Sequence, residues 1–149
     1  MIAMLRPHSW DFPVFLHVFG AMVLFGATLA TTTLAIAGWR LPEVRALSRS
    51  TFWALLAAAI PAWVVMRIGA GWAYSKEHHQ LFEKDPSWIG VGFGVADAGL
   101  IILLITTGLA FWWQRSQRPI AGRIVSVLAV LYLILLAIAW LAMSGKWGS

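Results

Sequence analysis

PVFLHVFGAMVLFGATLATTTLAIAG, residues 13–38, is an apolar run without a single Asp, Glu, Lys or Arg. A membrane-spanning α-helix needs about 20 consecutive apolar residues, and this run exceeds that length. Pro13 stands at its start, where the first turn of a helix tolerates proline, and Arg40 follows its end. The stretch therefore predicts a helix that crosses a lipid bilayer.

Three further runs of the same kind follow, at about 51–74, 86–113 and 120–143. The whole chain is 60% hydrophobic and only 11% charged, whereas soluble domains carry about 25% charged residues. Short connections between the runs make successive helices antiparallel neighbours. The sequence predicts an all-α membrane protein with one transmembrane domain over residues 1–149, folded as an up-down-up-down four-helix bundle.

Prolines locate the irregular points of this plan. Pro61 lies in the middle of the second span, where it donates no hydrogen bond and should kink the helix. Pro42 is a possible first residue of the same helix, which would then extend beyond the membrane. Residues 75–85 are expected to form a loop, with Asp85 as the N-cap of the third helix and Pro86 as its first residue.

The net charge of +5 comes from basic residues dispersed among the loops, none of them in a run of five, so nucleic-acid binding is not predicted. They are read instead as topology signals. Six arginines flank the first and third connections, against four basic residues at the other ends: Arg40, Arg45, Arg49, Arg115, Arg118 and Arg123 against Arg6, Lys76, Lys84 and Lys146. This asymmetry predicts that both termini face the outside.

Arg67 and Asp97 are charged residues inside the second and third spans. At 1.5 Å per residue they lie at depths of roughly 10 and 16 Å from the outer end, so they can meet. A charge near the bilayer centre costs about 3 kcal/mol, which favours pairing. One interpretation is an intramembrane ion pair that holds the two helices together, and the other is a proton, ion or ligand site.

His17 is the one histidine inside a predicted span, about one turn into the first helix and near the same surface as Arg67. It is either an interfacial histidine bonded to backbone or water, or a functional group in an outer-half site with Arg67 and Asp97. A neutral imidazole suits haem, copper or a quinone site. Haem b between two imidazoles would need a second intramembrane histidine, which the spans lack.

His78 and His79 lie between the second and third spans, close to Glu77, Glu83 and Asp85. A histidine pair beside carboxylates can bind zinc or copper, although adjacent residues on a helix diverge by about 100°. The sequence is compatible with both a metal site and a solvated loop in this segment. The chain has no cysteine, which excludes disulfides, thiolate metal sites and thioether-bound haem.

The segment FLHVFGAMVLFGATLA resembles the LHxxGAxxxxG opening of small bacterial four-helix membrane proteins of unknown function and, more distantly, the copper-resistance D-type membrane proteins. His17 and Gly20 carry the resemblance, which covers about fifteen residues of the first span. It implies a bacterial inner-membrane protein whose first-helix histidine binds haem or a metal ion. The absence of cysteine and the scatter of the five methionines along the chain argue against copper transport.

Three functions follow, each of a different class. The first is an accessory or structural subunit of a larger membrane complex or a homo-oligomer, for which Gly90 and Gly94 would permit close helix approach. The second is a haem-, quinone- or metal-binding protein with a site at His17, Arg67 and Asp97. A small transporter is the third. No catalytic motif is recognisable, so enzymatic activity is not assigned.

Overall fold

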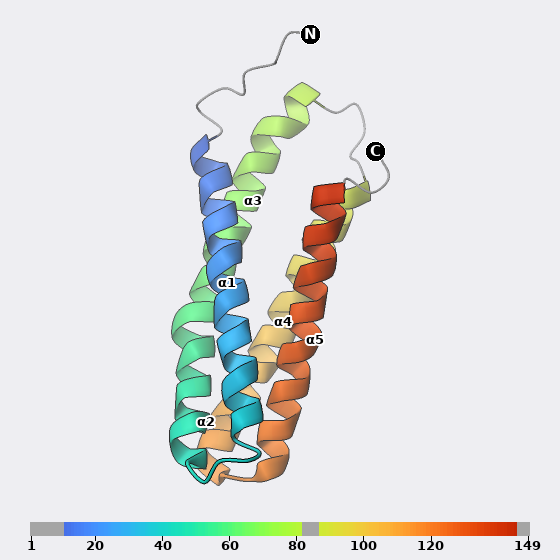
Figure 1. Cartoon of the computed structure of the whole chain (residues 1–149). Coiled ribbons are helices and arrows are strands. Elements are labelled where there is room, and N and C mark those ends of the chain that lie inside the picture. The colour runs from blue at the N-terminus through green and yellow to red at the C-terminus, as the bar shows by residue number, and fades with distance from the viewer. Residues whose placement is uncertain (1–10, 82–86, 146–149) are drawn as a thin grey trace.

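The computed structural model describes residues 11–81 and 87–145, and the side chains of residues 11–76 and 87–144. Over these ranges the chain is helical and contains no strand. The helices are α1 (Asp11–Ala37), α2 (Val44–Trp53), the π-helical segment η2 (Ala54–Ala59), α3 (Ile60–Leu81), α4 (Ser87–Ser116) and α5 (Pro119–Gly145). Because α2, η2 and α3 form one uninterrupted helix, the fold is a four-helix bundle (Figure 1).

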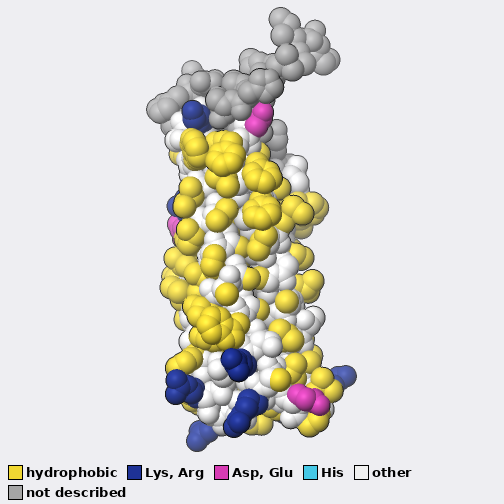
Figure 2. Space-filling view, turned by 90° about the vertical axis from the view of Figure 1, so that its left-hand side faces the viewer, with side chains coloured by type: hydrophobic (Ala, Val, Ile, Leu, Met, Phe, Trp, Pro, Cys, Tyr) yellow, Lys and Arg dark blue, Asp and Glu magenta, His cyan; other side chains and the backbone are white. Residues whose placement is uncertain are grey.

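Each of the four helices is long and apolar enough to cross a membrane. Large apolar side chains such as Phe15, Met22 and Trp140 are exposed, and Figure 2 shows apolar side chains over the middle of the face in view. A soluble protein does not expose apolar surface on this scale, whereas lipid accommodates it. The predicted fold class, an all-α four-helix membrane bundle, is confirmed.

The second helix is longer than the predicted span 51–74, because it begins at Val44 and ends at Leu81. The extension before residue 51 agrees with the prediction that the helix starts near Pro42. The loop predicted for residues 75–85 is wrong for its first half, since residues 75–81 are helical. The segment SKEHHQL is polar enough to leave the bilayer, but it contains neither glycine nor proline, so nothing in it ends a helix.

The irregularity at Pro61 takes the form of the π-helical segment just before it. There the backbone N–H of Ile60 donates to the carbonyl oxygen of Leu55, five residues earlier, instead of four. The wider turn gives room to a proline ring that would crowd the carbonyl of Ala57 in a regular α-helix. The second helix thus continues through Pro61, although proline itself donates no backbone hydrogen bond.

The bundle is closed at one end and open at the other (Figure 1). At the closed end, where α1 and α4 finish and α2 and α5 begin, α2 packs against both α1 and α4. Toward the open end, α1 stays against α3 and α4 stays against α5, but α3 and α4 share few contacts. The two pairs of helices therefore separate in the half of the bundle that contains His17 and Arg67.

Two glycines hold α1 against α3 in this open half. A Cβ atom added to Gly20 would lie 2.5 Å from the backbone nitrogen of Met66, and one added to Gly69 would collide with the backbone of His17. Only a residue without a side chain permits such an approach. This contact fixes the depth and the direction of His17 relative to α3.

Candidate functional site

A cavity of about 240 Å³ lies inside the open half of the bundle, and all four helices contribute to its walls. Most of the wall is apolar, and it includes Val14, Met66, Ala70, Gly92, Ala96, Leu136, Ala139 and Met143. His17 from α1 and Arg67 from α3 are polar groups in the same wall. An apolar cavity with a few convergent polar groups is the usual form of a small-molecule site.

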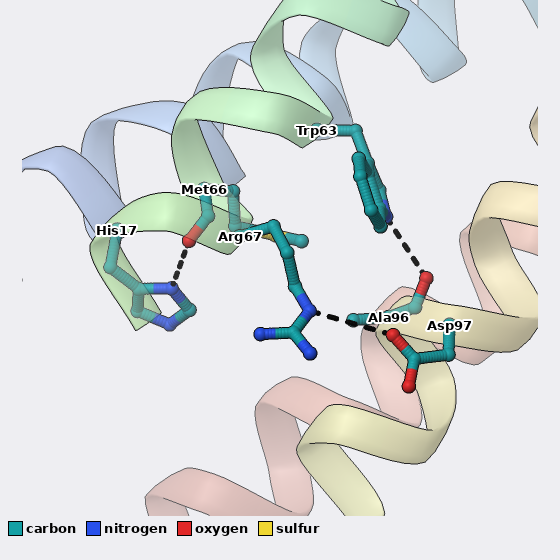
Figure 3. A network of polar contacts seen from close by, with 6 residues as sticks. All are labelled: His17, Trp63, Met66, Arg67, Ala96 and Asp97. Carbon is teal, nitrogen blue, oxygen red and sulfur yellow. Dashed lines mark hydrogen bonds and ion pairs between the residues drawn. The ribbon is translucent and has the colours of Figure 1, made fainter. Parts of the chain in front are cut away.

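His17 is half-buried in this wall, and its orientation is set by α3. Its Nδ1 donates to the carbonyl oxygen of Met66 over 3.2 Å (Figure 3). Since a carbonyl oxygen can only accept, the proton of the neutral ring resides on Nδ1 and Nε2 keeps its lone pair. Backbone bonds of this kind orient histidines that use the other nitrogen to bind a metal or accept a proton.

Arg67 and Asp97 lie together, at the edge of the cavity. Arg67 Nε is 3.4 Å from Asp97 Oδ1, and the guanidinium carbon stands 4.5 Å above the ring centre of Phe93. The contact is longer than a strong bidentate pair, which closes to about 2.7–2.9 Å. Arg67 is 34% exposed and Asp97 is 65% exposed, so the pair lies on the outward face between α3 and α4 and is not buried inside the bundle.

A second tie between α3 and α4 comes from Trp63, which sequence reasoning missed. Its indole Nε1 donates to the carbonyl oxygen of Ala96 over 2.9 Å, next to the contact between Arg67 and Asp97 (Figure 3). The signal in the sequence is a tryptophan in the middle of a span, because a half-buried indole N–H needs an acceptor. The contacts of Trp63 with Ala96 and of Arg67 with Asp97 join α3 to α4 on the closed-end side of the point where the two helices separate.

A groove on the outside of the bundle adjoins the cavity. Arg67, Tyr74, Ile89 and Phe93 line both spaces. Gly71 and Gly90 border the groove alone. The rings of Tyr74 and Phe93 meet edge to face at 5.5 Å, one from α3 and the other from α4. These side chains stand where the interior cavity adjoins the lipid-facing surface.

A haem does not fit this site. The cavity is smaller than the about 300–1,000 Å³ of sites for drug-sized ligands, and in the described part of the chain no second histidine faces His17 across it. Among the residues whose side chains the structure describes, 11–76 and 87–144, no group of three or more histidine, cysteine, aspartate or glutamate residues could hold a metal ion.

His78 and His79, predicted as metal ligands, belong to the last turns of α3. Their side chains lie outside the described residues, as do Glu83 and Asp85. Metal binding at this pair therefore stays a prediction.

Comparison of the chain with protein-family models, curated proteins and solved structures finds no match. The resemblance of the first helix to small bacterial four-helix proteins and to copper-resistance D-type proteins stays a prediction as well.

Proposed function

We propose that this integral membrane protein binds a lipid-soluble, single-ring ligand of the quinone class in the cavity between its four helices. The observation that carries the proposal is the position of the cavity directly beside the lipid-facing groove: the two spaces share four lining residues. A ligand dissolved in the bilayer can reach the cavity from this groove, between the shared side chains, without crossing water. The modest volume suits a flat head group, and the groove outside suits its apolar tail.

The polar groups of the wall match the head group of a quinone. Nε2 of His17 accepts a hydrogen bond from a quinol hydroxyl while Nδ1 stays bonded to Met66. Arg67 uses Nε for Asp97, and its guanidinium also carries two Nη donors that suit a carbonyl oxygen. A half-reduced or reduced quinone ring carries both groups that this requires: a hydroxyl that donates to His17 and an oxygen atom that accepts from Arg67.

Binding of decylubiquinol, kept reduced under inert gas, to the purified protein, measured by calorimetry in detergent, tests the proposal. Ala139→Leu adds atoms inside the cavity and is expected to weaken binding by about tenfold or more. Ala137→Leu adds the same atoms to the exposed face of the same helix and should leave binding unchanged. His17→Phe, which removes one hydrogen bond, is expected to weaken binding by about five- to tenfold.

Equal affinities for the Ala139→Leu and Ala137→Leu variants would contradict the cavity as the binding site. Unchanged affinity in His17→Phe would show that His17 makes no hydrogen bond to the ligand, although the cavity would remain its binding site. Absorption and metal content of the same sample report on haem or a bound ion, the other ligand classes predicted for His17.

An accessory subunit of a larger complex, or a homo-oligomer, is the second candidate, and one observation favours it. Asp97 exposes 65% of its side chain on α4, and a Cβ added to Gly90 or Gly94 on this helix would meet no atom within 4 Å. A partner helix seated here would cover a carboxylate that is paired with Arg67 but otherwise faces lipid, where polar groups are unfavourable. It would also cover the groove beside the cavity, which Gly90 borders, so the two functions compete for one surface.

We further propose that the chain resides in a bacterial inner membrane with both termini outside, as the arginine asymmetry indicates. The chain has no cysteine of its own, so single cysteines report position without background. Glu43→Cys and Ser116→Cys at the closed end should resist an impermeant thiol reagent applied to intact cells, whereas Ser75→Cys near the open end should react. Labelling at the first two positions but not the third would reverse the orientation.

A further inference from the structure

Six arginines collect at the closed end of the bundle, and every one of them is exposed. They come from the first connection, from α2, from the end of α4, from the connection between α4 and α5, and from the start of α5: Arg40, Arg45, Arg49, Arg115, Arg118 and Arg123. Figure 2 shows basic side chains gathered at this end, below the apolar band. We call this set the arginine cluster. It contains no lysine, although the chain has lysines elsewhere.

The cluster is not neutralised by the protein itself. Glu43 is the acidic residue of this end, and among the described residues no ion pair joins it to any arginine. Arg115 lies 4.9 Å above the ring centre of Phe111, one turn closer to the membrane. The guanidinium groups therefore have donors available to an anion from outside the chain.

The level of the cluster in the membrane is marked by three exposed tryptophans, Trp39, Trp53 and Trp112. Exposed tryptophans of membrane proteins lie at the height of the lipid head groups. Arg45 and Arg49 are four residues apart on α2, so they share one face of that helix. Two forked guanidinium groups side by side match the oxygens of a phosphodiester better than two ammonium groups would.

We propose that the arginine cluster is a binding site for anionic phospholipids, in which Arg45 and Arg49 hold a lipid phosphodiester. The partner is a lipid and not a soluble phosphate compound, because the cluster borders the apolar band and Arg115 lies against an aromatic ring of that band. This site is at the opposite end of the bundle from the quinone-class cavity and does not depend on it.

Native mass spectrometry of the purified protein with added phosphatidylglycerol or phosphatidylcholine tests the site. The wild-type chain is expected to retain phosphatidylglycerol in preference to phosphatidylcholine. The attraction between one basic residue and anionic lipid is worth about 1 kcal/mol, which corresponds to about fivefold in affinity. The Arg45→Gln/Arg49→Gln variant, which loses two such residues, should therefore bind phosphatidylglycerol about 25-fold more weakly. The Arg45→Lys/Arg49→Lys variant keeps both charges and should retain most of the preference.

Lys76→Gln, which removes one charge near the other end of the same helix, is the control and should bind phosphatidylglycerol as the wild type does. Equal retention of the two lipids, or equal loss in the control, would overturn the proposal. So would complete loss in the lysine variant, because the effect would then reflect damage to α2. Displacement of the lipid by millimolar inorganic phosphate would show a soluble-phosphate site instead and would also overturn it.

Discussion

Trp113→Ala is expected to lower the free energy of unfolding by about 3 kcal/mol, the low end of the range for removing a buried tryptophan. Trp113 is 1% exposed and fills the closed end of the bundle. Its ring occupies the space that a Cβ on Gly38 or Gly122 would need, so it joins α4 to the end of α1 and the start of α5. In a bilayer the free energy of transferring the side chain out of the core contributes less to the loss than it does in water. The cavity that the removed ring leaves nevertheless stays unfilled, and the packing contacts around it are lost.

The neighbouring residue offers a matched control, since Trp112 is 40% exposed on the same helix. Trp112→Ala removes the same atoms from the outward face and should cost less than about 1 kcal/mol. Unfolding with increasing mole fraction of a denaturing detergent, followed by circular dichroism, measures both. Similar losses in the two variants would contradict the packing role of Trp113.

The helices were predictable because a bilayer imposes length and polarity limits that can be read directly from a chain. The four apolar runs each became one helix of the bundle, and Pro61 marked the place of the π-helical segment. The end of α3 was not predictable in this way. Polarity shows where the chain leaves the lipid, but the helix ends only where its backbone hydrogen bonding ends, and no residue of the segment 75–81 interrupts it.

The candidate site was predictable in depth but not in direction. Counting residues along the spans placed His17, Arg67 and Asp97 at similar heights, and in the structure His17 and Arg67 line one cavity. Which side a residue faces follows from amphipathic periodicity, and a helix that is apolar all round has little of it. For this reason the sequence did not show that Asp97 faces outward.

The contact between α1 and α3 was equally hidden. Gly20 and Gly69 are two of 13 glycines in the chain, and Gly26 and Gly94, in similar apolar surroundings, border open space. Only the packed helices distinguish the glycines that let backbones touch from those that do not. The bond from His17 to Met66 depends on that contact and could not be read from either residue alone.

A double-mutant cycle on Arg67 and Asp97 is expected to give a coupling energy of about 3 kcal/mol. Arg67→Met leaves the Asp97 carboxylate alone on the outward face, where an unpaired charge costs about 3 kcal/mol. Asp97→Leu leaves Arg67, whose longer side chain can reach toward the membrane surface, so its cost should be smaller. The double variant removes both charges and should return to within about 1 kcal/mol of the wild type.

The same denaturing-detergent titration measures all four proteins of the cycle. Additive losses would mean that the 3.4 Å contact contributes no coupling, and a larger loss in Asp97→Leu than in Arg67→Met would contradict lipid exposure as the reason for the cost. The mass of the complex extracted from native membranes separates the two proposed roles of this face. If Asp97→Leu reduces the mass of the extracted complex while the purified chain stays folded, the Asp97 carboxylate contacts another subunit. If the mass is unchanged and equals that of a single bundle, the face that carries Arg67 and Asp97 is open to ligands from the lipid.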